Sequence, residues 1–133
     1  MLRLGLDLVS VAEVRRSLDE HGERYLSRVF TEREIEDCGG RLSPSAERLA
    51  GRFAAKEATI KVLASVSDAT PWHEIEVLAG DRGEPTLHLN GNCAELARKA
   101  DLGSFAASIT HEGEYAAAAV IAYQDLRIGP VGR

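Results

Sequence analysis

The stretch RFAAKEATIK, residues 52–61, is the part of the chain from which its fold and function are most directly predicted. At about 100° per residue, a helix through this stretch places six apolar residues on one continuous face: Leu49, Ala50, Phe53, Ala54, Ile60 and Ala64. Glu57 and Lys61 fall in the middle of that face. A charge in an apolar stripe is costly unless it is paired or bound to a metal, so this acid and base indicate a functional site.

The second informative stretch is GLDLV, residues 5–9, near the start of the chain. Its leucines alternate with Gly5 and Asp7, which predicts a β-strand that carries a lone acid. Two carboxylates from separate elements, Asp7 and Glu57, suit Mg²⁺, which prefers octahedral oxygen ligands and takes few of them from protein. Two simpler interpretations stay open: Asp7 as an exposed strand acid, and Glu57 as the ion-pair partner of Lys61.

Helix and strand signals surround these two stretches. Ser10 and Thr31 each open a capping box and therefore a helix, and Ser43-Pro44 opens a long central helix that runs to about Val66. Alternating apolar residues predict two hairpins, with a further helix between them. The predicted strands are residues 3–9, 74–79, 85–89, 104–110 and 115–123, the last of them alanine-rich and expected to be buried on both faces.

The order of these elements predicts an α+β domain, with an antiparallel sheet packed on the long central helix. We expect a single domain over residues 1–124, followed by a loose tail at residues 125–133. A chain of 133 residues with 44% hydrophobic and 28% charged residues agrees with one domain built around one core.

Charge, hydropathy and cysteine spacing exclude several classes of protein. The net charge is −5, and the basic residues do not form the clustered footprint of a nucleic-acid-binding protein. No apolar run approaches the length of a membrane span, and Arg3 and Asp7 interrupt any N-terminal signal sequence. Cys38 and Cys93 lack metal-ligand spacing and are expected to be reduced thiols. We therefore expect a cytoplasmic protein with no nucleic-acid or membrane partner.

Two further groups of residues are candidates for ligand contact. Arg52 and Lys56, one turn apart on a neighbouring face of the helix, predict a basic ridge for phosphates or else a solvated flank. Ser108 and His111 end a predicted strand, where they suit contact with a ligand. A serine nucleophile assisted by histidine is the alternative, although the sequence lacks the G-x-S-x-G turn of α/β-hydrolases.

Three motifs taken together resemble the holo-acyl-carrier-protein synthase family, the small phosphopantetheinyl transferases. They are GLDLV at 5–9, FAAKEATIK at 53–61, and SITH at 108–111 before the final apolar strand. Their order, their spacing and the chain length all agree, and the resemblance extends to Tyr123. It implies a 4′-phosphopantetheinyl transferase-like fold, assembled as a homotrimer with the active site between adjacent subunits.

The resemblance also implies a reaction. Coenzyme A donates its phosphopantetheine arm to a serine hydroxyl of an apo acyl carrier protein, and 3′,5′-ADP is released. Asp7, Glu57 and the coenzyme A pyrophosphate would hold Mg²⁺, which neutralises charge building on the transferring phosphorus. Glu57 is also the candidate base for the serine proton, and Lys61 would stabilise the pyrophosphate oxygens. Carriers of fatty acid, polyketide and peptide synthesis all fit this reaction.

The same resemblance assigns coenzyme A contacts to further positions. The phosphates would meet Arg52 and Lys56 beside Lys61, the adenine would meet the loop of Gly83 and Pro85, and the pocket would be bordered by Ser108 and His111.

Two positions depart from the family pattern. Glu13 stands where the family often has a basic residue near the start of the first helix, so docking of an acidic carrier would depend on Arg15 and Arg16. Ala106 stands where a histidine often precedes the strand serine. Two alternatives come from other functional classes: a non-catalytic scaffold that binds coenzyme A or a carrier, and a Ser/His hydrolase that acts through Ser108.

Overall fold

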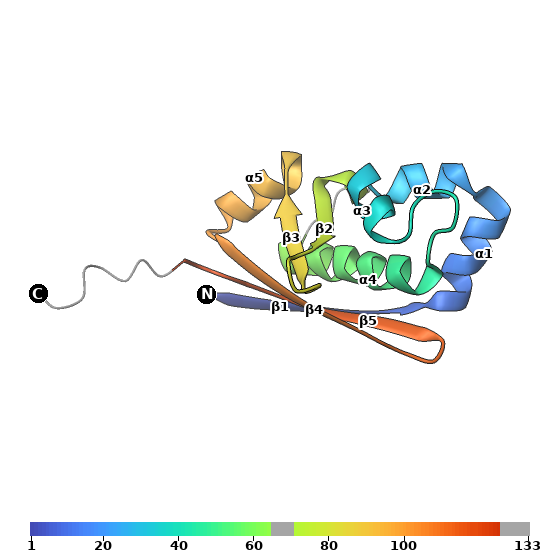
Figure 1. Cartoon of the computed structure of the whole chain (residues 1–133). Helices are drawn as coiled ribbons and strands as arrows, with labels where there is room; N and C mark the ends of the chain where they lie inside the picture. Colours follow the sequence, from blue (N-terminus) through green and yellow to red (C-terminus); the bar gives the residue numbers. More distant parts are fainter. Residues whose placement is uncertain (65–70, 126–133) are drawn as a thin grey trace, which may run out of the picture.

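The computed structural model describes residues 1–64 and 71–125, and residues 65–70 and 126–133 lie outside this description. The chain forms an α+β domain in which helices cover one side of an antiparallel sheet (Figure 1). The helices are α1 (Val11–His21), α2 (Glu23–Val29), α3 (Glu32–Asp37), α4 (Ala46–Leu63) and α5 (Gly91–Lys99), with a 3₁₀ turn η1 (Trp72–Glu74). The strands are β1 (Leu2–Ser10), β2 (Ile75–Ala79), β3 (Pro85–Leu89), β4 (Ser104–Glu112) and β5 (Tyr115–Tyr123). Within the described ranges, none of the helices is both long and apolar enough to cross a membrane.

The ends of the helices agree with the sequence signals in most places. Thr31 opens α3 with a complete capping box, whereas α4 begins after Ser45, two residues later than predicted, because the Ser45 hydroxyl accepts from the Arg48 amide. α4 ends at Leu63, and the predicted end at Val66 lies outside the described residues. No local signal predicts α2, which spans only two turns and has no side-chain cap.

The main sheet has the strand order β1-β5-β4, and every pairing in it is antiparallel. α4 lies across one face of this sheet (Figure 1), where β5 presents only small side chains and one valine: Ala116, Ala118, Val120 and Ala122. The approach is close at Gly5, where an added Cβ would lie 2.1 Å from the carbonyl oxygen of Ala58. Glycine at this position lets α4 rest directly on β1, and this contact brings the next inward residue, Asp7, beside the helix.

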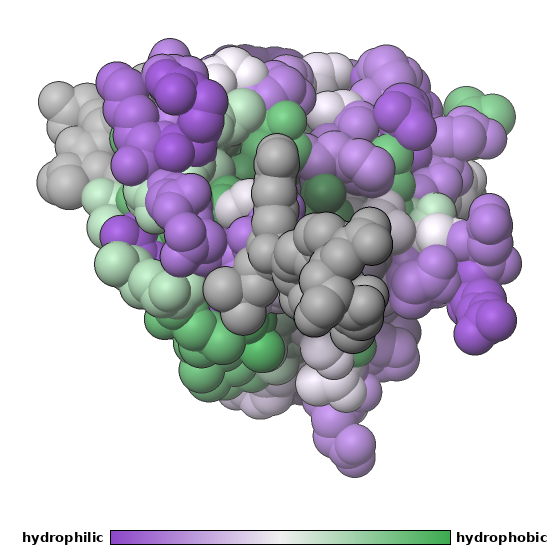
Figure 2. Space-filling model, turned by 90° about the vertical axis from the view of Figure 1, so that its left-hand side faces the viewer, coloured by the Kyte–Doolittle hydropathy of each residue, from purple (hydrophilic) through white to green (hydrophobic). Residues whose placement is uncertain are grey.

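The opposite face of the sheet is apolar and open. Leu2, Leu4, Leu6 and Leu8 of β1 are each 64–66% exposed, and Ile121 and Tyr123 of β5 share this face. Figure 2 shows hydrophobic surface gathered on the lower side of this end of the molecule, where the sheet lies in Figure 1. The prediction that the last strand is buried on both faces is therefore wrong for the single chain. Its odd-numbered residues point away from α4, and no described element covers them.

The remaining strands form a separate hairpin beside α4. β2 pairs antiparallel with β3, from Ile75 opposite Leu89 to Ala79 opposite Pro85. One edge of β2 faces β3, and the other edge faces α3. β2 is thus held between a strand and a short helix, and the turn of the hairpin reaches toward the β4 side of α4.

Candidate active site

Asp7 and Lys61 form the first part of the site. The Lys61 ammonium donates to the Asp7 carboxylate at 2.9 Å and to the Leu6 carbonyl oxygen at 2.8 Å. The Lys61 side chain is 54% exposed and that of Asp7 is 17% exposed, so solvent or a ligand reaches the pair. Lys61 therefore pairs with Asp7, across two elements, and not with Glu57 along the helix.

Glu57 lies beside this pair. Partial burial raises the pKa of its carboxyl above the ordinary value, the negative charge of Asp7 raises it further, and Lys61 partly offsets both effects. Asp7 is thus near enough for its charge to oppose ionisation of Glu57, and the Lys61 ammonium lies against Asp7. We call Asp7, Glu57 and Lys61 the β1 cluster, after the strand at whose edge they lie.

The predicted apolar stripe around Glu57 is partly wrong. The buried face of α4 instead contains Ala55, Ala58, Val62 and Leu63, while Phe53 and Ile60 are only half-buried and Ala64 is exposed. Glu57 therefore lies at the border of the buried face. The error arises because helical period shows which residues share a face, whereas the positions of the sheet and hairpin determine which face is buried.

The donors of the β1 cluster fit a divalent cation. Mg²⁺ prefers carboxylate oxygens, takes one or two of them from protein, and completes its shell with water and substrate phosphates. The described residues contain no group of three or more His, Cys, Asp or Glu side chains that could hold a metal, so the Asp7–Glu57 pair would need such outside ligands. A cation between these carboxylates would also relieve their repulsion.

Lys56 is not on the helix surface, contrary to the basic ridge predicted for it. Its side chain is fully buried, and its ammonium lies 2.7 Å from the Glu34 carboxylate and 2.6 Å from the carbonyl oxygens of Trp72 and Ile75. Burial lowers the pKa of this ammonium, and Glu34 partly offsets the effect. Because all three donors of the ammonium are taken inside the core, Lys56 is not available to coenzyme A phosphates.

Arg52, in contrast, joins the predicted loop residues in one cavity of about 190 Å³. This hairpin pocket is lined by Arg52, Val77, Leu78, Ala79, Gly83, Pro85 and Ile109. The Arg52 Nε is buried and has no hydrogen-bond partner among the residues that the structure describes. Gly83 has a φ of 79°, which only glycine adopts without strain, so the turn that shapes the pocket depends on it. The structure thus brings together three residues predicted to contact coenzyme A.

Ser108 and His111 are both exposed on β4 but do not meet. Their odd separation along the strand places them on opposite faces of the sheet, and the nearest acid to the His111 Nδ1 is Glu47, at 4.0 Å. A serine–histidine nucleophile built from these two residues of one chain is therefore contradicted by the fold.

The β1 cluster and the hairpin pocket lie on opposite sides of α4. Asp7 belongs to β1, one edge of the three-stranded sheet, and Ile109 belongs to β4, the other edge. Glu34, the buried partner of Lys56, is a residue that the sequence did not predict for this role, because its capping box indicates only the start of a helix. When one carboxylate both caps a helix and pairs with a buried lysine, the sequence shows only the capping pattern.

Comparison with known proteins agrees with this geometry. The profile of the 4′-phosphopantetheinyl transferase superfamily matches residues 3–120. The holo-[acyl-carrier-protein] synthase of Chloroflexus aggregans is 39% identical over 95% of this chain and 98% of its own length, and that of Desulforudis audaxviator is 38% identical over 92% of each.

Solved structures extend the likeness to the fold. An ACPS–CoA complex from Chronobacterium ammoniagenes has a TM-score of 0.79 and 30% identity, and the match covers 95% of this chain and 99% of that one. The acyl carrier protein synthase of Mycobacterium tuberculosis has a TM-score of 0.70 and 33% identity, over 92% and 96% of the two chains. With matches over nearly its whole length and an acid pair where the motifs predicted one, this chain belongs to the 4′-phosphopantetheinyl transferase superfamily.

Proposed function

We propose that this chain transfers the 4′-phosphopantetheine group of coenzyme A to a serine hydroxyl of an apo acyl carrier protein and releases 3′,5′-ADP. The observation that carries the proposal is the β1 cluster, which places two mutually repelling carboxylates and a lysine at a solvent-reachable edge. The family, whose listed relatives are holo-[acyl-carrier-protein] synthases, supports the same reaction.

The chemistry follows from the charges of the cluster. Asp7 and Glu57 would hold Mg²⁺, which when bound neutralises negative charge on the phosphates. The raised pKa of Glu57 brings its carboxylate closer to the basicity that a general base needs, so it is our candidate acceptor for the serine proton. Lys61, whose ammonium already lies against Asp7, would stabilise the pyrophosphate oxygens from the same side.

The hairpin pocket is the proposed site for the nucleotide end of coenzyme A. A guanidinium in a cavity suits a phosphate when, as here, its Nε has no hydrogen-bond partner among the described residues. The apolar wall formed by Pro85 and Ile109 suits adenine. Of the two residues predicted to border this pocket, His111 lies on the same face of β4 as the pocket residue Ile109, whereas Ser108 lies on the opposite face. A CoA complex of a relative, the Chronobacterium protein, supports coenzyme A as the co-substrate.

A homotrimer would join the two parts of the site. Within one chain the β1 cluster and the hairpin pocket lie at different edges of the sheet, and a ring of identical subunits places one edge of each chain against the other edge of the next. The open leucine face offers apolar surface for such contacts. Sedimentation of the purified protein is expected to give the mass of three chains, and a stable, active monomer would contradict the trimer.

The proposed carrier contacts lie on α1. Arg15 and Arg16 are exposed, and Arg15 borders a groove of about 690 Å³ whose apolar side chains include Leu18, Leu26 and Pro44. Three acids, Asp19, Glu23 and Glu47, also line this groove, so attraction of an acidic carrier would depend on Arg15 and Arg16 and not on the charge of the groove as a whole. The proposed reaction also places the protein in the cytoplasm, where its two substrates would meet.

The decisive experiment is mass spectrometry of apo carrier proteins incubated with this protein, coenzyme A and Mg²⁺. We expect the carrier to gain the mass of one phosphopantetheine group, and to gain none when a chelator has removed the metal. Coenzyme A binding without any mass gain would instead identify a non-catalytic scaffold. Labelling of Ser108 by a serine-reactive probe, with coenzyme A ignored, would identify a hydrolase.

A further inference from the structure

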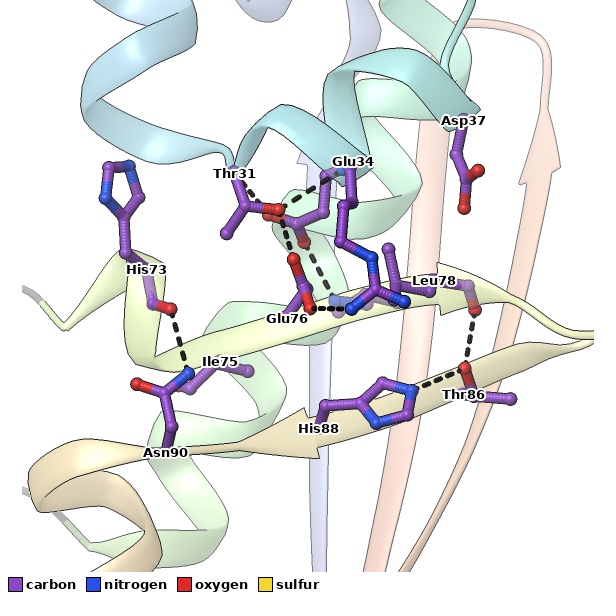
Figure 3. Close-up of polar contacts among 12 residues, drawn as sticks. Thr31, Glu34, Asp37, His73, Ile75, Glu76, Leu78, Thr86, His88 and Asn90 are labelled. Atoms are coloured by element: carbon purple, nitrogen blue, oxygen red, sulfur yellow. Dashed lines mark hydrogen bonds and ion pairs between the residues drawn. The ribbon is translucent and has the colours of Figure 1, made fainter.

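The free edge of β2 is held by side chains and not by a strand. β3 pairs with one edge of β2, while the backbone groups on the other edge point toward α3 (Figure 3). Unpaired amide and carbonyl groups on such an edge must find other partners or remain costly.

Two carboxylates of α3 serve as these partners. The Glu34 carboxylate accepts from the Val77 amide at 2.9 Å, and the Asp37 carboxylate accepts from the Ala79 amide at 2.9 Å. Glu34 and Asp37 are three residues apart and so share one face of α3, matching alternate residues of the strand. On the same edge, the buried Lys56 ammonium donates to the Ile75 carbonyl oxygen at 2.6 Å. Every second residue of β2 is therefore anchored.

The anchored residues are walls of the hairpin pocket. Val77 and Ala79 both line it, and the turn that carries Gly83 begins directly after Ala79. Arg52, which belongs to α4 and not to the hairpin, also lines the pocket. The width of the pocket is thus set by the distance between α4 and a strand whose outer edge rests on α3.

We infer that Asp37 and Glu34 are positioning residues for coenzyme A, because they hold the β2 wall of the hairpin pocket at a fixed distance from Arg52. The inference rests on the proposed function, which assigns this pocket to the nucleotide. Asp37 is the last residue of α3, where a negative charge opposes the helix dipole, so helix stability does not explain its presence.

Substitution of Asp37 can distinguish a positioning role from a role in folding, whereas substitution of Glu34 cannot. Glu34 is fully buried with Lys56, so its loss would leave an unpaired charge in the core. The Asp37–Ala79 bond is exposed, so water can take the place of the carboxylate. We therefore expect a variant without this carboxylate to fold while the end of the strand is released.

The test compares three variants of the full-length protein: Asp37→Ala, Asp37→Asn and Glu36→Ala. Glu36 is an exposed acid on the same helix for which the structure gives no bond to β2, so Glu36→Ala is the matched control for lost charge. Asparagine keeps an oxygen that accepts from the Ala79 amide and serves as the conservative rescue. KM for coenzyme A, KM for the carrier and kcat are measured for each, together with the thermal midpoint.

For Asp37→Ala we expect KM for coenzyme A to rise by about 3- to 10-fold, the effect of one released hydrogen bond, with carrier KM and kcat unchanged. Asp37→Asn and Glu36→Ala should keep the wild-type KM. An Asp37→Ala protein that matches Glu36→Ala, or one whose two KM values rise together, would overturn the inference. If the wild-type protein itself fails to modify a carrier, the proposed function has failed, and that result is distinct from either outcome.

Discussion

The two edges of the main sheet show how differently a reactive centre and a binding pocket are built. At the β1 edge, Asp7, Glu57 and Lys61 are held close enough for the Asp7 charge to raise the pKa of Glu57. Toward the β4 edge, the hairpin pocket is made of apolar side chains and one arginine. The first arrangement costs electrostatic energy within the free chain, whereas the second depends on how accurately a hairpin is held. Functional groups of the first kind are typical of reaction centres.

The same contrast separates two lysines of one helix. Lys61 is half-exposed and pairs with a carboxylate at the site, and Lys56 is fully buried and pairs with a carboxylate in the core. The two lysines are five residues apart on α4, and this separation places one ammonium at the site and the other in the core. Each of the following experiments perturbs one side of these contrasts.

The largest effect is expected for Glu57→Gln. Glutamine keeps the shape of the side chain but lacks the charge that would hold a metal and accept a proton, so kcat should fall by about 10²- to 10⁴-fold. Turnover of an apo carrier, followed by mass spectrometry, measures the loss.

Folding stability supplies the control for Glu57→Gln. Because the pKa of Glu57 is raised in the folded chain, the unfolded chain binds fewer protons between the ordinary value of 4.5 and the raised one, and stability falls as pH increases through that window. The variant lacks this loss and should be at least as stable as the wild type at neutral pH. A variant that is less stable but fully active per folded molecule would make Glu57 a structural residue.

The second prediction concerns the separation of the two edges. Glu57→Gln and Arg52→Glu chains should each be nearly inactive alone. When the two are co-expressed, about one interface in four joins a chain with intact Glu57 to a neighbour with intact Arg52, so about one quarter of wild-type activity should return. Activity of the purified mixed oligomer is the measurement.

The control uses the two variants purified separately, mixed, and assayed before their subunits exchange. This mixture should stay inactive. A mixed oligomer of confirmed composition without activity would mean that each chain carries its own complete site.

The third prediction compares the two lysines through stability. Lys56→Met should cost about 3–5 kcal/mol in the free energy of unfolding, because it leaves the Glu34 carboxylate uncompensated in the core. Lys61→Met, at an exposed pair, should cost only about 0–1 kcal/mol. Denaturant unfolding measures the loss of stability in each variant. Equal losses would contradict the assignment of Lys56 to the core and of Lys61 to an exposed pair.

The smallest effect is expected on α1, away from both edges. Arg15→Glu combined with Arg16→Glu should raise KM for the carrier at low salt and leave KM for coenzyme A unchanged, since each exposed contact contributes only about 0–1 kcal/mol. Glu13→Arg should lower the carrier KM. If no variant moves the carrier KM at low salt, the carrier docks elsewhere and α1 is only structural.

Much of this fold could be predicted from local patterns. The capping box at Thr31, the alternation in the five strands and the glycines of the turns each act within a few residues, so their elements appear in the structure close to their predicted places. α2 could not be predicted, because a helix of two turns without a cap is stabilised by the burial of Leu26 and Val29 and not by local signals.

The order of residues alone was sufficient to indicate the family, the acid pair of Asp7 and Glu57, and the grouping of Arg52 with Gly83 and Pro85. The tertiary structure decided which lysine of α4 is buried, which face of β5 is open, and that Ser108 and His111 point apart. The physical reason is the same in each case. Periodicity tells which side chains share a face, but only the packing of sheet, hairpin and helix against one another determines which faces lose contact with water.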